Sequence, residues 1–93
     1  MRSIFKYKIE ISERSQILMP MNSTILDVQF QKVDTYNQQL VIWVLVYPEA
    51  RLNERRTFRV FGTGSHVNEA ENLDHISTVQ DGQGYVWHVF EVK

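Results

Sequence analysis

The segment "LVIWVLVY" at residues 40–47 decides the fold, because it is the longest apolar run in the chain. A membrane-spanning helix needs about 20 apolar residues, so this run is far too short to cross a bilayer. Alternate residues of a strand point to opposite faces of its sheet. Since both faces of this segment are apolar, we expect a central strand that is covered by protein on each side.

The segments on either side alternate apolar and polar residues with period two, which is the pattern of half-buried strands. Examples are "IFKYKIEI" at residues 4–11, "ILDVQFQKV" at 25–33 and "RRTFRVFG" at 55–62. The sequence "DGQG" at residues 81–84 predicts a hairpin turn, because glycine tolerates positive φ. We also expect strands at 16–20, 75–80 and 85–92, a turn at 12–15, a hairpin loop at 34–39, and a helical turn or two within 67–73 that is capped by Ser65.

These elements predict a mostly β chain, as a small antiparallel barrel or sandwich of six or seven strands with at most one short helix. The 93 residues are expected to form a single domain, residues 1–93. A domain of this size buries only roughly 60–65% of its unfolded surface. Oligomerisation is therefore a natural supplement to its modest core.

Composition narrows the class of function. The chain has 10 basic and 11 acidic residues, whereas a general nucleic-acid binder needs a basic excess to neutralise phosphates. The balanced net charge does not exclude a local basic patch. Since there is no cysteine, disulfides and thiolate metal sites are excluded. The N-terminal residues lack the long apolar core of a signal peptide, so we expect a cytoplasmic protein with no membrane partner.

The first candidate for ligand binding is the loop "GTGSH", which consists of Gly62, Thr63, Gly64, Ser65 and His66. Glycines let backbone N–H groups approach phosphate oxygens closely, often at a helix N-terminus. The loop lacks the lysine and the spacing of a P-loop, however, and it is not GxGxxG. The alternative is a turn that ends a strand, with its glycines at unusual φ.

Arginines cluster just before this loop, where Arg51, Arg55, Arg56 and Arg59 lie within nine residues. The planar guanidinium suits bidentate recognition of phosphate or carboxylate. Arg59 is the most notable of the four, because its predicted strand leads into the glycine loop. Arg55 and Arg56 point to opposite faces of a regular strand. The alternative for each arginine is a solvated surface charge or an ion pair with a neighbouring glutamate.

Aromatic and amide side chains are candidates for contacts with a nucleobase. Stacking on an aromatic ring is worth about 1–3 kcal/mol per base, and amides suit base edges because they both donate and accept. The candidates are Trp43, Tyr47, Tyr85, Trp87 and His88 for stacking, and Gln29, Gln31, Thr78 and Gln80 for base edges. The alternatives are that the tryptophans belong to the core and that the polar residues cover an exposed sheet face.

The sequence offers little support for catalysis. Ser65 and His66 are adjacent, and adjacent residues of an extended chain point apart, so they do not form a triad. His66, His75 and His88 lack metal-site spacings such as HxH or HxxxH. We therefore expect no enzymatic activity, no metal and no cofactor.

Several segments, taken together, carry a resemblance: "KYKI" (6–9), "QILMP" (16–20), "ILDVQFQ" (25–31), "LVIWVLV" (40–46), "RRTFRVFGTGSH" (55–66), "ISTVQ" (76–80) and "YVWHVFE" (85–91). Their order and spacing resemble a widespread family of small bacteriophage proteins, with the pattern KYxI, MPxxAxIL-VQ-Q, L-W-LV, R-F-IFGTGH, I-TVQ and VWHVFE. The resemblance covers nearly the whole chain. The chain departs from the pattern at Ser23-Thr24, where a small residue such as Ala is usual, and at Ser65, whose insertion leaves the register of His66 open.

This family is similar to viral sponge proteins that block CBASS immunity by sequestering cyclic nucleotide signals. The resemblance implies a homo-oligomer that binds a cyclic dinucleotide or trinucleotide without cleaving it, in the cytoplasm of the infected bacterial host. It implies that phosphates contact Gly62, Thr63, Gly64, Ser65, Arg59, and Arg55 or Arg56, and that bases contact Trp43, Trp87 or Tyr85 together with Gln29, Gln31 or His88. The alternative is a small phage protein that acts by protein–protein interaction, as a host-factor inhibitor or a virion accessory protein.

Overall fold

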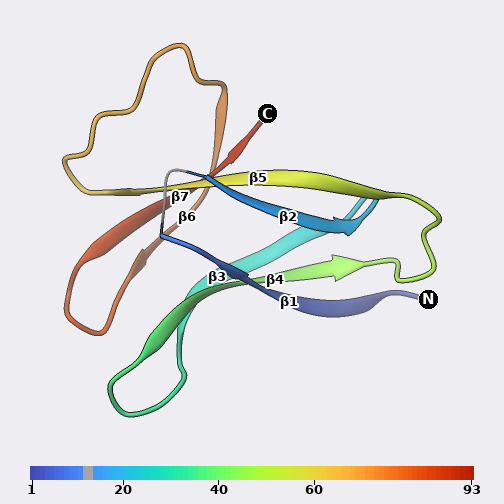
Figure 1. Cartoon of the computed structure of the whole chain (residues 1–93), viewed down its shortest axis with the longest axis horizontal. Coiled ribbons are helices and arrows are strands. Elements are labelled where there is room, and N and C mark those ends of the chain that lie inside the picture. Colours follow the sequence, from blue (N-terminus) through green and yellow to red (C-terminus); the bar gives the residue numbers. More distant parts are fainter. Residues whose placement is uncertain (12–13) are drawn as a thin grey trace.

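The computed structural model describes residues 1–11 and 14–93. Its elements are strands: β1 (Ser3–Ile9), β2 (Ser15–Pro20), β3 (Thr24–Lys32), β4 (Gln38–Val46), β5 (Asn53–Gly62), β6 (Leu73–Gln80) and β7 (Val86–Val92) (Figure 1). They form a three-stranded sheet in the order β1-β4-β3 and a four-stranded sheet in the order β2-β5-β7-β6. Neighbouring strands pair antiparallel in both sheets.

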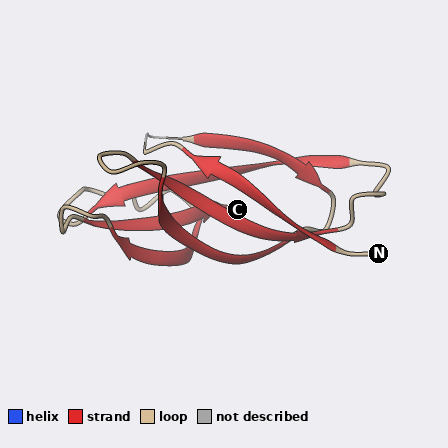
Figure 2. Ribbon diagram, turned by 90° about the horizontal axis from the view of Figure 1, so that it is seen from below, coloured by secondary structure: helices blue, strands red, loops and turns tan. Residues whose placement is uncertain are grey.

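The two sheets pack on each other as a flat sandwich with Cα extents of 40 × 39 × 16 Å (Figure 2). The core between them takes Ile9, Val28, Leu40, Ile42, Val44 and Val46 from the three-stranded sheet, and Ile17, Met19, Phe58 and Val89 from the four-stranded sheet. Within the described residues no strand of one sheet pairs with a strand of the other. Of the two predicted architectures, the sandwich is therefore confirmed, and the closed barrel is wrong.

Strand β4 is the central strand of its sheet, as its sequence predicts. Its inward residues are Leu40, Ile42, Val44 and Val46, and all of them are buried in the core. On its outward side Val41 is buried, but Trp43 and Leu45 are only half-buried. The expectation of cover on both faces therefore holds for the inward face and fails in part for the outward face.

The hairpin between β6 and β7 forms at the predicted "DGQG" turn. Gly84 has φ of 91° there, and the Asp81 carboxylate accepts backbone N–H groups from Gln83 and Tyr85. At residues 67–73, where a helical turn was expected, the chain forms a loop in which Asn68 accepts the N–H of Glu71. Val67 is 44% exposed in this loop, so the weak apolar pattern does not reach the core. The turn predicted at residues 12–15 lies partly outside the described residues.

Candidate functional site

Strand β5 divides its side chains between the core and the outside of the four-stranded sheet. Phe58 belongs to the core and Val60 packs against it, so Arg59 and Phe61, which alternate with them, lie on the opposite face. The register with β7 and then β6 extends this outward face across three strands. We call it the four-stranded face, and it consists of Arg59, Phe61, His75, Thr78, His88 and Phe90.

A chain of hydrogen bonds links the glycine loop to this face. Nε2 of His88 lies 2.9 Å from the Thr63 hydroxyl, and Nδ1 of the same ring lies 3.1 Å from the Thr78 hydroxyl. The Thr78 hydroxyl in turn lies 2.9 Å from Nε2 of His75. Hydroxyls and neutral imidazoles both donate and accept hydrogen bonds, so every donor in this series of hydrogen bonds can exchange roles with its acceptor. In either arrangement the hydrogen bonds hold the imidazoles of His75 and His88 in place at the protein surface.

Aromatic contacts position the arginine and the second histidine. The Arg59 guanidinium lies over the ring of Phe61, 4.6 Å from its centroid, which is a cation–π contact. Phe90 contacts Phe61 edge to face, with centroids 5.6 Å apart, and it contacts His75 in the same way at 5.3 Å. Phe61 is buried under the arginine, whereas His75 is exposed. The imidazole of His75 is therefore accessible to a ligand.

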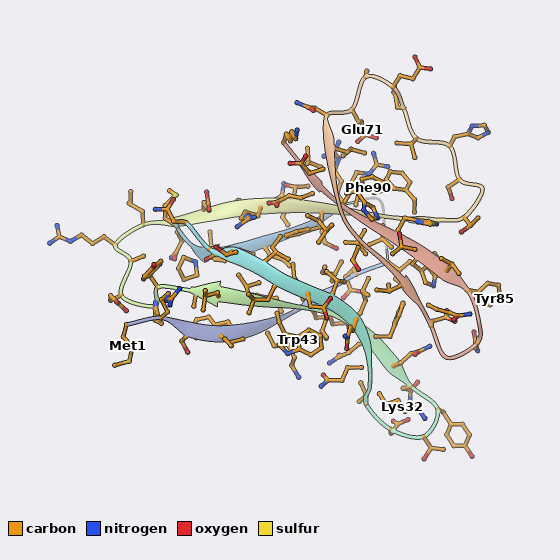
Figure 3. All side chains as sticks on the ribbon, turned by 180° about the vertical axis from the view of Figure 1, so that it is seen from behind. Met1, Lys32, Trp43, Glu71, Tyr85 and Phe90 are labelled. Carbon is orange, nitrogen blue, oxygen red and sulfur yellow. The ribbon has the colours of Figure 1, made fainter. Side chains whose placement is uncertain are left out.

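A hollow of about 410 Å³ lies beside Arg59, lined by Arg14, Arg59, His66, Asn68 and Glu71. The Glu71 carboxylate pairs with the Arg59 guanidinium and lies 3.3 Å from the Arg14 guanidinium. Nε of Arg59 is buried and has no hydrogen-bond partner among the described residues. Figure 3 shows Glu71 and Phe90 on the same side of the molecule as the loop between β5 and β6. Two arginines thus converge on one carboxylate, which is the arrangement that an anion site requires.

The glycine loop itself is a tight turn. Ser65 donates its backbone N–H to Gly62, at 3.1 Å, and Thr63 donates to Val86, at 3.4 Å. Gly64 has φ of 92°. Two of the backbone donors that the sequence offers for a phosphate are therefore used within the protein. The backbone therefore forms the turn that was the alternative to a phosphate loop. The side chains still reach the candidate site, because Thr63 contacts His88 and His66 lines the hollow.

Arg56 does not join this site. It lies on the inward side of β5, where its guanidinium forms two hydrogen bonds to Glu91 and one to the Ser23 carbonyl. The hydrogen bonds and the charge of Glu91 raise the pKa of Arg56 above its ordinary value. This arginine therefore fixes β5 to β7 and to the start of β3, and a phosphate cannot reach it without breaking that pair.

The other predicted ligand residues are spread over the molecule. Trp87 lies on the inward side of β7, where its Nε1 donates to Asp81 at 3.1 Å. Tyr85 is exposed in the hairpin turn just before β7. Arg55 is exposed near the far end of β5. Trp43, Gln29 and Gln31 lie on the outside of the three-stranded sheet. The structure thus brings together a part of the predicted set, which consists of Arg59, Thr63, His66, Thr78 and His88.

Among the polar residues of the site, sequence reasoning missed Arg14, Asn68 and Glu71 and, as a ligand contact, His75. Strand parity places His75 and Thr78 on opposite faces, because they are an odd number of residues apart. A bulge between His75 and Ser77 shifts the register and turns both side chains to one face. The only signal in the sequence is that "HISTVQ" begins and ends with a polar residue, His75 and Gln80, and this pattern does not reveal the bulge.

Within the described part of the chain, no group of three or more His, Cys, Asp or Glu side chains is arranged to hold a metal ion. None of its elements is a helix that is long and apolar enough to cross a membrane. No curated protein and no solved structure matches the chain. A family model described as a domain of unknown function, DUF7352, matches residues 1–93, so the chain belongs to the DUF7352 family.

Proposed function

We propose that this protein binds a phosphate-bearing nucleotide on the four-stranded face and holds it without cleaving it. The proposal rests mainly on the surroundings of Arg59. Its guanidinium is mostly buried, it lies at the base of the glycine loop, and its Nε lacks a partner among the described residues. It faces a hollow shared with Arg14, His66 and Asn68. Planar guanidinium groups bind phosphate oxygens bidentately, and partial burial strengthens that interaction.

A ligand phosphate would take the position that the Glu71 carboxylate occupies between the two arginines. The neighbouring histidines and threonines would then contact the rest of the ligand. His75 presents an exposed ring supported by Phe90, which suits stacking with a base. The hydroxyls of Thr63 and Thr78 and the ring of His88 supply donors and acceptors for sugar or base edges.

Binding without cleavage is supported by the surroundings of His88. A histidine that removes a proton from a hydroxyl usually has a carboxylate on its second nitrogen, which stabilises the imidazolium. Nε2 of His88 does contact the Thr63 hydroxyl, but its Nδ1 contacts Thr78, a neutral group. The pair is therefore suited to hydrogen bonding more than to nucleophilic attack.

The resemblance to small bacteriophage proteins suggests the ligand. On this proposal the protein is a phage-encoded sponge in the cytoplasm of an infected bacterium. It sequesters a cyclic dinucleotide or trinucleotide and so inhibits CBASS-type defence. A cyclic ligand with two or three phosphodiesters needs a local positive site and not a basic protein, which agrees with the net charge of −1.

The experiment is a calorimetric titration of the protein with a panel of cyclic di- and trinucleotides, followed by heating and recovery of the ligand. Arg59→Ala should weaken binding at least tenfold. Arg55→Ala is the matched control, because it removes the same charge from the same strand about 13 Å away, at roughly 3.3 Å per residue. No binding of any panel member at micromolar concentration would sink the proposal, and recovery of cleaved ligand would indicate an enzyme.

A second candidate function, protein binding, rests on the loop between β3 and β4. Tyr36 is 93% exposed at its tip. The loop is nonetheless well fixed, because the Asp34 carboxylate accepts the N–H groups of Tyr36 and Asn37, each at 2.9 Å. Exposed tyrosines on ordered loops are common anchors in protein interfaces. A pulldown from infected cells should recover a stoichiometric partner that Tyr36→Ala loses; recovery of none would count against this function.

A further inference from the structure

The outward side of the three-stranded sheet carries a row of three residues with opposite charges at its ends. Lys6 of β1 and Asp27 of β3 are both register partners of Trp43 on β4. Ile42 and Val44 are in the core, so Trp43 between them faces outward. Across the sheet, the row therefore consists of a positive side chain, an aromatic one and a negative one. We call the surface around this row the three-stranded face.

Apolar side chains surround this row. Ile4 is 60% exposed and Leu26 is 48% exposed, while Trp43 and Leu45 are half-buried. Figure 3 shows Trp43 well away from Glu71 and Phe90 of the candidate ligand site. Contiguous exposed apolar side chains on a sheet mark an interaction surface more often than isolated ones do. The tryptophan at the centre is the type of residue that dominates such interfaces.

Neither charge at the ends of the row is neutralised within the described part of the chain. Lys6 donates to the amide oxygen of Gln31 at 2.8 Å, and Asp27 accepts from the amide of Gln29 at 2.8 Å. Both amides are neutral, and no ion pair of Lys6 or Asp27 occurs among the described residues. The charges are therefore available to a partner that carries the opposite pattern.

We propose that a second copy of this chain covers the three-stranded face. The arrangement has a two-fold axis that runs parallel to β4, between the two stacked faces. Such an axis places β1 of each copy over β3 of the other, so that Lys6 lies opposite the partner's Asp27 and Trp43 lies at the centre. An axis perpendicular to β4 would place Lys6 against its own equivalent, which is repulsive. A two-fold interface must be self-complementary. The charges of this row meet that condition only about the axis that runs parallel to β4.

The inference is independent of the ligand site, which lies on the other sheet. It also gives Trp43, Gln29 and Gln31 a role different from the base recognition expected from the sequence. The charges would fix the orientation of the two copies, because opposite charges across an interface set its register more than its strength.

The test is sedimentation velocity on the 11.0 kDa chain without ligand, from low micromolar to about 200 μM. The wild-type protein should sediment as a dimer at the upper concentrations. Lys6→Glu and Asp27→Lys should each weaken dimerisation at least tenfold, because each places like charges opposite one another. An equimolar mixture of the two variants should restore a dimer, since both cross-interface pairs are then opposite in charge.

Two further variants check the pairing of the charges. The double variant Lys6→Glu/Asp27→Lys should dimerise about as well as wild type, because it reverses both charges of each pair. The geometry is decided by Lys6→Glu alone, since an axis perpendicular to β4 leaves like charges opposite one another both in the wild type and in this variant, and so predicts no weakening. Lys8→Glu is the control, because Lys8 and Gln29 share the register partner Val41, so Lys8 would lie opposite a neutral amide. Circular dichroism checks that each variant is folded. A wild-type protein that is monomeric at every concentration overturns the proposal whatever the variants do, and so does a dimer that Lys6→Glu and Lys8→Glu weaken equally.

Discussion

The carboxylate of Glu71 pairs with the guanidinium of Arg59 and holds the long loop between β5 and β6 against the four-stranded face. The same carboxylate lies 3.3 Å from Arg14, just before β2. One acidic side chain thus neutralises two cations from separate parts of the chain. In the proposed function, Glu71 occupies the position of the ligand phosphate and must leave when the ligand binds.

Replacing Glu71 should therefore improve ligand affinity while it lowers stability. In Glu71→Gln the two arginines keep their positions but lose the competing charge, so the affinity for a cyclic nucleotide should rise roughly three- to tenfold, or about 1 kcal/mol. Titration calorimetry measures the affinity, and thermal unfolding should show a lower midpoint. Glu69→Gln, an exposed change in the same loop, is the control. Weaker binding by Glu71→Gln would mean that Glu71 itself contacts the ligand.

The ion pair between Arg56 and Glu91 should be a stability determinant and not a ligand site. The two side chains are only 18% and 17% exposed, so Glu91→Gln leaves a poorly solvated guanidinium and should cost about 2 kcal/mol in the free energy of unfolding, below the 3–5 kcal/mol typical of full burial. Asp74→Asn, which breaks the exposed pair with Lys93, should cost less than about 0.5 kcal/mol. Urea denaturation compares the two. Equal costs would show that the Arg56 pair is no better than a surface pair.

The two glycines of the loop should respond differently to alanine. Gly64 has φ of 92°, and a Cβ added there would meet no atom within 4 Å, so Gly64→Ala suffers from the backbone alone and should lose about 1 kcal/mol. A Cβ at Gly62 would make an ordinary contact, 3.5 Å from the Trp87 ring. Gly62→Ala should therefore be neutral or stabilising by up to about 1 kcal/mol. If Gly62→Ala is the more damaging change in urea denaturation, this account of the loop is wrong.

Asp81 should give the hairpin a pH-dependent stability. The hydrogen bond from Trp87 and the backbone N–H groups of the turn lower the pKa of Asp81 below its ordinary value of 3.8. A lowered pKa in the folded state means that the ionised form stabilises the fold above the unfolded pKa, and that this is lost as the pH falls through the folded pKa. Asp81→Asn should lower the melting temperature at neutral pH. The difference from wild type should shrink below about pH 4, and a difference unchanged down to about pH 2 would contradict this role.

The antiparallel strands could be predicted from sequence because their signals are local, whereas the choice between a barrel and a sandwich stayed open until the strand pairing was known. The apolar run of β4 and the two-residue alternation of β1, β3 and β5 give strands, and "DGQG" gives a hairpin. The order of strands within each sheet depends on long-range pairing, for which single-sequence patterns hold no signal. The outward side of β4 illustrates the limit, because a pattern that is apolar on both faces does not reveal that one face lies on the surface of a single chain.

The candidate site was only partly predictable. Alternation along β5 separates Arg56 from Arg59 but does not show which of them faces the core; Phe58 and Val60 decide it through their burial. The proximity of Thr63 and His88 follows from the pairing of β5 with β7, which a local pattern cannot supply. Glu71 lies in an irregular loop, and His75 reaches the face only through a bulge. Both features depend on tertiary structure.

The most direct test of the central claim is a two-dimensional ¹⁵N–¹H NMR titration of the labelled protein with the best-binding cyclic nucleotide. Ligand binding on the four-stranded face should shift the backbone signals of Arg59, Thr63, His75 and His88, together with the side-chain Nε signal of Arg59, which lacks a partner among the described residues of the free protein. The signals of Lys6, Asp27 and Trp43 should stay in place. Shifts confined to Trp43 and its neighbours, or no shifts at saturating ligand, would contradict the proposed site.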